Sequence, residues 1–429
     1  MRKNRMKTIA LALAAAMALT ALGGCSSKSA GTTADGKTKL VMALWDEEQN
    51  KTMKKMIAVY EEQNPNVTVE TQLTTWTEYW TKLEASVTGG NAADIMWINV
   101  LKAEEYLDAG VLMDVSEVAT ALDLKANYPA ALVEAYNFDG KQYAIPKDFD
   151  TNGLFYNKEL FDKAGVAYPT EDWTMDDFSK AAEQLAGKLD KGEFACAVPF
   201  NSGQTTFQGS IYANGGYILS SDRTKIGWDD PKTMEGLQVW VDLVLNGYSA
   251  TQEQMADTLP DAMFEGGKVA MLLAGNYMIS TFEQNEAIKG KYDVVSRPSF
   301  NGKKTDVING LGYAVNSQTK NKEEALKFLT WLGGTEAMEI QGKDGTVISA
   351  RNDAQHFYVD TQPELNLKIF TANLEDTVLL EPRCPKYTEL VNVQKTYMAE
   401  IWAGTISVEE GCKKMTEEQQ VIVDQMNKK

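Results

Sequence analysis

Segments with strand character alternate with segments of helix character in the first part of the chain after its leading residues. Residues 39–45, 67–69 and 94–98 have the apolar or alternating pattern of β-strands. Residues 53–60 and 75–87 carry apolar side chains at helical spacing. Because strand and helix alternate, this region is predicted to form an α/β fold with a mostly parallel sheet.

A second α/β region is predicted to follow from about residue 150. Thr174 and Asp177 form a capping box before an amphipathic helix, and residues 269–274 have the pattern of another buried strand. The last quarter of the chain has mainly helical periodicity. With 429 residues, the sequence is long enough for two domains with large cores.

The leading residues have the pattern of a secretory signal peptide. Basic residues precede an apolar run over residues 9–22, which is too short to span a bilayer comfortably. The sequence Leu-Gly-Gly-Cys ending at Cys25 resembles the lipobox of bacterial lipoproteins, which implies cleavage before Cys25 and diacylation of that residue. Two acyl chains would anchor the protein stably at the outer face of the cytoplasmic membrane. The alternative is an ordinary signal peptide followed by an incidental cysteine. Residues 1–24 are therefore assigned to the signal peptide, and the small, polar residues 25–38 to a flexible tether.

Charge and residue counts exclude several classes of function. The chain has 42 Lys and Arg against 60 Asp and Glu, a net charge of −18, so phosphate backbones repel it and no nucleic-acid partner is expected. His356 is the only histidine, which excludes a two-His metal site, and we predict neither a metal nor another cofactor. No Walker A pattern is present, so an ATPase that works with this protein must be another polypeptide.

Several longer stretches carry a resemblance to a known family. They are residues 143–148 (Tyr-Ala-Ile-Pro-Lys-Asp), 153–165, 265–271 and 401–410. In these stretches, and over essentially its whole length, the chain resembles the family 1 extracellular solute-binding proteins of carbohydrate ABC importers, the maltose-binding-protein-like group. Two positions depart from the family pattern, since Ala93 and Ser349 stand where the family often has proline.

The resemblance implies a two-lobed α/β fold of the type II periplasmic-binding-protein kind, with hinge-connected lobes and a ligand cleft between them. It assigns residues 39–149 and 308–354 to an N-terminal lobe, and residues 150–307 and 355–429 to a C-terminal lobe. It also implies that the protein is a monomer that binds a carbohydrate, an oligosaccharide, and delivers it to the permease subunits of an ABC importer. No catalysed reaction is expected.

The residues alone leave two other functions open. A receptor of the same class whose cleft is acidic and aromatic would suit a cationic ligand, a polyamine or a quaternary amine. A glycosidase needs only two carboxylates, and the many acidic residues do not exclude such a pair, although no pair stands out.

A saccharide cleft needs carboxylates, amides or Arg for the hydroxyls and aromatic rings for the C–H faces. Residues of these types at predicted strand ends and lobe crossings are the candidates for ligand binding. For Tyr277 the role is implied by the resemblance, because the family commonly has a stacking aromatic there. Gly310 would allow close approach of a ligand or hinge motion. The full set of candidates is Trp45, Asn99, Asp148, Trp228, Asn276, Tyr277, Gly310 and Arg351, with Asp150 as a near substitute for Asp148.

Most of the candidates also have a structural interpretation. Trp45 is equally suited to a core and Asn99 to a turn or cap. Trp228 would pack against Trp240, and Arg351 would form an interlobe salt bridge. Residues predicted to lie outside the ligand contacts are Glu47, Glu48, Trp76, Trp80 and Trp173.

Overall fold

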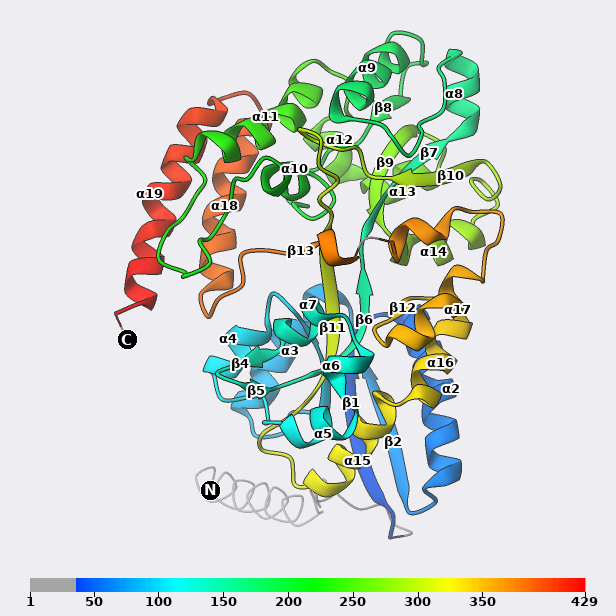
Figure 1. Cartoon of the computed structure of the whole chain (residues 1–429), viewed down its shortest axis with the longest axis vertical. Helices are drawn as coiled ribbons and strands as arrows, with labels where there is room; N and C mark the ends of the chain where they lie inside the picture. The colour runs from blue at the N-terminus through cyan, green and yellow to red at the C-terminus, as the bar shows by residue number, and fades with distance from the viewer. Residues whose placement is uncertain (1–35, 373, 429) are drawn as a thin grey trace, which may run out of the picture.

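Two β-sheets, each covered by helices, form the framework of the protein (Figure 1). The computed structural model describes residues 36–372 and 374–428. The two sheets belong to two α/β lobes, one with the blue, cyan and yellow segments and the other with mainly the green and red segments. The predicted fold class, a two-lobed α/β protein, is confirmed.

The sheet of the first lobe combines parallel and antiparallel strands. β1 pairs in parallel with β2 and β3, and β11 runs antiparallel to β3 and β6. The strand order is β12-β6-β11-β3-β1-β2, and β13 pairs with β11. The strands are β1 (Thr38–Leu44), β2 (Val67–Leu73), β3 (Ile95–Asn99), β6 (Ile145–Asp150), β11 (Val307–Val315), β12 (Ile348–Ser349) and β13 (Val378–Leu379).

Strand β3 is buried on both faces, which explains its uninterrupted apolar sequence. Ile95 and Trp97 pack into one core cluster, whereas Met96 and Ile98 pack into another on the opposite face. The helices that supply these cores are α2 (Glu47–Gln63), α3 (Trp76–Thr88), α4 (Ala103–Asp108), α5 (Ser116–Ala121), α6 (Leu124–Asn127), α7 (Ala130–Ala135), α15 (Lys322–Leu332) and α16 (Thr335–Asp344). A short hairpin, β4 (Asn137–Phe138) with β5 (Lys141–Gln142), precedes β6.

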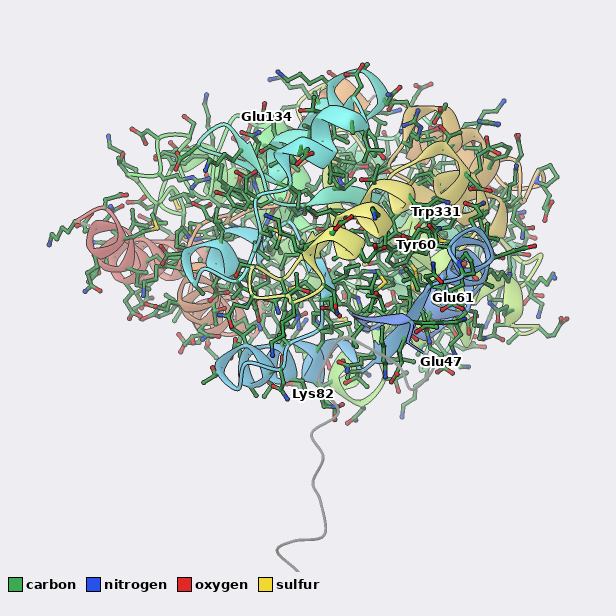
Figure 2. The ribbon with its side chains drawn as sticks, turned by 90° about the horizontal axis from the view of Figure 1, so that it is seen from below. Glu47, Tyr60, Glu61, Lys82, Glu134 and Trp331 are labelled. Atoms are coloured by element: carbon green, nitrogen blue, oxygen red, sulfur yellow. The ribbon has the colours of Figure 1, made fainter. Side chains whose placement is uncertain are left out.

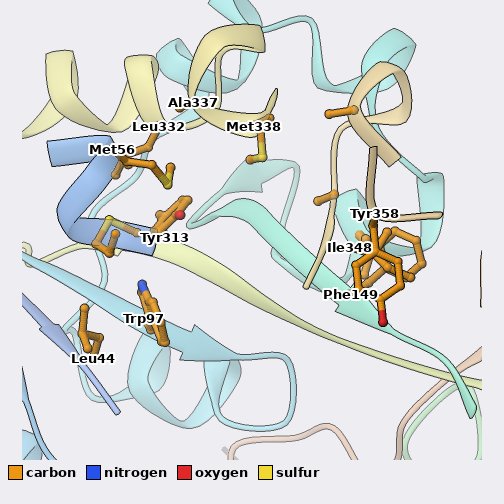
Figure 3. Packing of buried hydrophobic residues seen from close by; sticks show 14 of the residues in the cluster. Leu44, Met56, Trp97, Phe149, Tyr313, Leu332, Ala337, Met338, Ile348 and Tyr358 are labelled. Carbon is orange, nitrogen blue, oxygen red and sulfur yellow. The ribbon is translucent and has the colours of Figure 1, made fainter. Parts of the chain in front are cut away.

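The larger core of this lobe brings distant parts of the chain together. Figure 3 shows Met56 of α2, Leu332 of α15 and Met338 of α16 close to Tyr313 of β11. All four residues are fully buried. The outer surface, seen from below in Figure 2, is instead rich in charged side chains such as Glu61.

The second lobe has a four-stranded sheet of order β10-β7-β9-β8. Its strands are β7 (Asn152–Asn157), β8 (Phe194–Cys196), β9 (Val269–Gly275) and β10 (Tyr292–Ser296). Its helices are α8 (Lys158–Ala164), α9 (Met175–Ala186), α10 (Phe207–Ala213), α11 (Pro231–Leu245), α12 (Gln252–Asp257), α13 (Pro260–Glu265), η1 (Asn276–Met278), α14 (Ile279–Gln284), α18 (Tyr387–Trp402) and α19 (Val408–Met426). The predicted capping box is confirmed at α9, where Thr174 and Asp177 hydrogen-bond reciprocally.

The two sheets are joined by very short connections. β6 ends at Asp150 and β7 begins at Asn152, so Thr151 alone separates the two strands. The chain returns between β10 and β11, and passes between the lobes again after β12. There Tyr358 donates a hydrogen bond to the Asn276 carbonyl at 2.7 Å. The elements of this last connection are η2 (Asn352–Ala354), α17 (Gln355–Val359), η3 (Leu367–Phe370) and η4 (Leu374–Asp376).

Two kinds of structure are absent from the part of the chain that the structure describes. None of its helices combines the length and the apolar composition that a bilayer crossing requires. No group of three or more His, Cys, Asp or Glu side chains within residues 36–372 and 374–428 is arranged to hold a metal ion. The predicted signal peptide, the anchor at Cys25 and most of the tether lie outside the described residues.

Candidate functional site

A cleft of about 750 Å³ lies between the two lobes, where strands from both sheets end. Its volume is within the range of small-molecule sites, roughly 300–1,000 Å³. The first lobe contributes Trp45, Trp76, Asn99, Asp148, Asp150 and Asn309 among others. The second lobe contributes Asn201, Gln204, Gln208, Asp261, Asn276 and Tyr277, and the C-terminal segment contributes Glu381, Tyr387 and Gln394.

Aromatic rings form one wall of the cleft. Trp45 follows β1 and its ring centroid lies 5.0 Å from that of Trp76, in an edge-to-face arrangement. Tyr79 and Trp97 lie behind Trp45 and fix its ring from the core side. Trp76 itself is 48% exposed, which is unusual for a tryptophan and leaves a large apolar face for a ligand.

Two aspartates project from the end of β6. Asp148 and Asp150 are two residues apart on the strand, so both point to the same face of the sheet. Asp148 accepts hydrogen bonds from the Lys147 ammonium and from the Leu311 backbone N–H at 3.2 Å. Burial raises the pKa of Asp148, and the Lys147 charge opposes that rise. Lys147 is buried, 4.4 Å from the centre of the Trp97 ring, and donates to Gln49 at 2.5 Å.

A chain of side-chain amides connects the two lobes through Asp150. Asn99 donates to the Asn309 side chain at 3.2 Å, and Asn309 donates to Asp150 at 3.4 Å. Asp150 also accepts a hydrogen bond from Gln204 of the second lobe. Burial is the main cause that raises the pKa of Asp150 to about 7, and the neighbouring carboxylates of Asp148 and Asp306 raise it further.

The second lobe presents an amide and an aromatic ring where β9 ends. Asn276 is 1% exposed, and its Oδ1 accepts the Thr151 N–H at 3.2 Å. Its Nδ2 has no hydrogen-bond partner, although it is buried and the residue lines the cleft. Tyr277, the next residue, is 40% exposed and also lines the cleft.

The structure therefore brings five of the eight candidates together in one cleft: Trp45, Asn99, Asp148, Asn276 and Tyr277. Asp150, named as a substitute for Asp148, lines the same cleft. This placement shows shared geometry, whereas ligand contact by these residues stays a prediction.

The other three candidates do not line the cleft. Trp228 is fully buried in the core of the second lobe, where its indole N–H donates to Gln419 at 2.8 Å. Arg351 pairs with Asp353 at 2.9 Å, two residues further along the chain, so neither the ligand contact nor the interlobe salt bridge is seen. Gly310 is tightly packed inside the sheet, since an added Cβ would lie 2.9 Å from the Asp148 carbonyl oxygen. These three predictions are wrong in their placement.

Sequence reasoning missed several residues of the cleft. Trp76 and Glu48 were predicted to lie outside the ligand contacts, yet both line the cleft. The exposure of Trp76 arises from its position at the first turn of α3, beside Trp45, and helical spacing does not reveal that. The glutamines and the C-terminal residues come from segments without a distinctive motif: Gln204, Gln208, Tyr387 and Gln394.

The lining suits a polar ligand with apolar faces. Carboxylates and amides offer fixed acceptors and donors, and the rings of Trp76 and Tyr277 offer stacking surface. A two-lobed fold with such a cleft at the strand ends is typical of solute-binding proteins.

The comparison with known families places the chain in such a class. The family model described as "Bacterial extracellular solute-binding protein" matches residues 45–339. The chain belongs to this family.

Three curated relatives are binding proteins whose names state a saccharide ligand. A multiple sugar-binding protein of Streptococcus mutans is 24% identical over 77% of this chain and 80% of its own length. A galactooligosaccharide-binding protein of Bacillus subtilis is 24% identical over 75% of each chain. The maltodextrin-binding protein MdxE of Bacillus subtilis is 23% identical over 92% of this chain and 90% of its own.

Solved structures agree with the fold. The ABC substrate-binding protein Lmo0181 of Listeria monocytogenes, determined in complex with cycloalternan, superposes with a TM-score of 0.80 at 25% identity, covering 89% of this chain and 98% of its own. The GacH receptor of Streptomyces glaucescens superposes with a TM-score of 0.79 at 20% identity, covering 90% of this chain and 98% of its own.

Proposed function

We propose that the protein is the extracellular receptor of an ABC importer and that it binds an oligosaccharide in the cleft between its lobes. The observation that carries the proposal is the pairing of exposed aromatic faces with a dense set of carboxylates and amides in one interlobe cleft. Relatives whose names state sugar, galactooligosaccharide and maltodextrin binding support the carbohydrate class.

The binding event requires no chemistry on the ligand. Trp45, Trp76 and Tyr277 would stack on C–H faces of sugar rings, and Asn99, Asp148 and Asn276 would hydrogen-bond the hydroxyls. Because the cleft is lined by both lobes, a bound ligand stabilises the closed arrangement, which the importer's permease would recognise.

Isothermal titration calorimetry against a panel of oligosaccharides tests the proposal. A saccharide that binds with a micromolar or lower Kd, and is recovered chemically unchanged, is the expected result. Binding restricted to polyamines or quaternary amines would overturn the substrate class, and release of shorter saccharides would establish a glycosidase instead.

We further propose that diacylated Cys25 holds the receptor at the outer face of the cytoplasmic membrane. The lipobox-like sequence before Cys25 supports this anchor. Metabolic labelling with a radioactive fatty acid should mark the wild-type protein and leave Cys25→Ala unlabelled. Equal labelling of both proteins would contradict the anchor.

A further inference from the structure

The charged side chains that line the cleft, among the described residues, are all acidic. Within the described part of the chain, the lining residues include six carboxylates and no Lys, Arg or His. The carboxylates belong to Asp46, Glu48, Asp148, Asp150, Asp261 and Glu381. A lining of this kind repels acidic ligands and raises the local concentration of cations.

Some of these carboxylates already have partners within the protein. Lys147 neutralises Asp148, and Arg383 pairs with Glu381 at 3.1 Å. Asp46 accepts the Gln49 N–H at 2.8 Å as the N-cap of α2. These groups are therefore satisfied without a ligand.

Asp150 differs from them, because no cationic side chain pairs with it among the described residues. Its two oxygens each accept an amide N–H, one from Gln204 and the other from Asn309 at 3.4 Å. Two donors on two oxygens suit the ionised carboxylate, which only accepts hydrogen bonds. Burial and the nearby Asp148 and Asp306 disfavour that same ionised form. A positive charge in the cleft would remove this conflict.

A second buried group beside Asp150 also lacks a partner. Asn276 Nδ2 is a donor without an acceptor, and its own Oδ1 holds the N–H of Thr151, the residue that follows Asp150. A buried amide N–H without a protein partner can donate a hydrogen bond to a ligand oxygen. A ligand with an oxygen acceptor close to a positive group would satisfy both side chains. A polyamine has the charge but offers no oxygen, and a plain oligosaccharide has the oxygen but no charge.

We propose that the cleft selects a saccharide bearing a protonated amine, with Asp150 as the counter-charge and Asn276 as the donor to a neighbouring ring oxygen or hydroxyl. This inference rests on the proposed carbohydrate-binding function and specifies its ligand class. Asp150 thereby becomes a specificity-determining residue.

Matched pairs of saccharides test the inference with the full-length protein in detergent. Chitosan oligosaccharides are compared with cello-oligosaccharides of equal length, and 6-amino-6-deoxy-maltodextrins with maltodextrins. We expect the amine-bearing member of at least one pair to bind about tenfold or more tightly than its neutral partner. Asp150→Asn should weaken amine binding about tenfold or more beyond any loss that it causes in neutral binding.

Asp139→Asn is the matched control, because Asp139 lies in an exposed turn with a φ of 52° that asparagine also tolerates. It should leave both affinities unchanged.

The pH dependence of binding gives a readout on the wild-type protein, independent of whether the variant folds. The 6-amino-6-deoxy-maltodextrins are the probe for this readout, because their alkyl amine stays mostly protonated from about pH 5.5 to about pH 8. Their binding should weaken from about pH 8 to about pH 5.5 as Asp150 takes up a proton, whereas maltodextrin binding stays level. The titratable groups that act on Asp150 include Asp148, Asp306, Tyr136 and Tyr277, and the tyrosines remain neutral over this range. Lys147 pairs with Asp148, and Arg297 pairs with Asp306.

The outcomes separate this inference from the proposed function. Neutral saccharides that bind as tightly as their aminated partners, or an Asp150→Asn variant that weakens both equally, would overturn the charge selection and leave carbohydrate binding intact. If no saccharide of either kind binds, the proposed function itself is wrong.

Discussion

At the scale of single residues, burial determines which tryptophans are able to meet a ligand. Trp228 was predicted to bind the ligand and Trp76 was not, yet Trp76 is 48% exposed in the cleft and Trp228 is fully buried. Trp76→Ala should lower saccharide affinity about tenfold or more, because it removes a stacking face, and should change the free energy of unfolding by less than about 1 kcal/mol. Calorimetric titration and urea unfolding of the same preparation measure both effects.

Trp228→Phe is the reciprocal substitution. It removes the indole donor and leaves the buried Gln419 oxygen without its 2.8 Å partner, so we expect a loss of about 2 kcal/mol in the free energy of unfolding. The saccharide affinity of this variant should equal that of the wild type. An affinity loss in Trp228→Phe, with Trp76→Ala unaffected, would reverse the assignment of the two residues.

Asp150 also makes the stability of the protein depend on pH. Its pKa is raised to about 7, chiefly by burial, so between about pH 4 and pH 7 the folded chain holds a proton that the unfolded chain has released. The contribution of Asp150 to the free energy of unfolding therefore falls as the pH rises through this range. Asp150→Asn lacks that loss, so its stability relative to the wild type should increase by up to about 4 kcal/mol between these pH values and then level off. Urea unfolding at several pH values measures the difference, and parallel curves for the two proteins would contradict it.

At the scale of elements, the sequence patterns predicted those strands and helix caps that depend on residues close together in the chain. The apolar run at residues 269–274 became β9, and the pair Thr174 and Asp177 became the capping box of α9. The position of Trp228 was not predictable in this way, because its environment comes from residues far away in the sequence. One of them is its hydrogen-bond partner Gln419, 191 residues further along the chain. Gly310 was likewise predicted to allow close approach of a ligand or hinge motion, whereas Leu132 and the Asp148 backbone fill that side of the strand.

The short helix α10 shows how one element depends on a missing side chain. Gly209 lies against the buried Arg297, and an added Cβ would stand 2.3 Å from the guanidinium carbon. Arg297 pairs with Asp306 at 3.2 Å and donates to the Thr206 carbonyl at 3.0 Å. Gly209→Ala should displace the guanidinium and lower the free energy of unfolding by about 2–3 kcal/mol, as measured by urea unfolding.

Gly187→Ala provides the control for this prediction. Gly187 ends α9 with a φ of −73°, and an added Cβ there meets its nearest atom at 3.6 Å, an ordinary contact. Its stability should stay within about 0.5 kcal/mol of the wild type. Similar losses in both variants would show that the contact with Arg297 is not the cause.

At the scale of the whole molecule, side chains of the two lobes contact each other directly at α4. Glu104 of α4 in the first lobe forms an ion pair with Arg223 of the second lobe. Next to this pair, Lys102 donates to Thr388 of α18 at 2.5 Å and lies 5.2 Å from the centre of the Tyr387 ring. These contacts, which we call the α4 latch, join the two lobes. Because both lobes line the cleft, we expect a bound ligand and the latch to stabilise the same arrangement of the lobes, so each should strengthen the effect of the other.

Removing the charge of Glu104 should open the lobes and weaken binding. Glu104→Gln keeps the shape of the side chain but loses the ion pair, so the radius of gyration of the free protein in solution scattering should increase. Saccharide affinity should fall about fivefold, corresponding to about 1 kcal/mol for a half-buried pair, although Glu104 does not line the cleft. Glu117→Gln, a substitution at an exposed position of α5, should change neither quantity.

High salt offers a second comparison, since about 1 M NaCl screens the partly exposed pair and should weaken ligand binding by the wild type more than by Glu104→Gln. Equal salt dependence in the two proteins, with identical scattering profiles, would show that the latch does not contribute to closure.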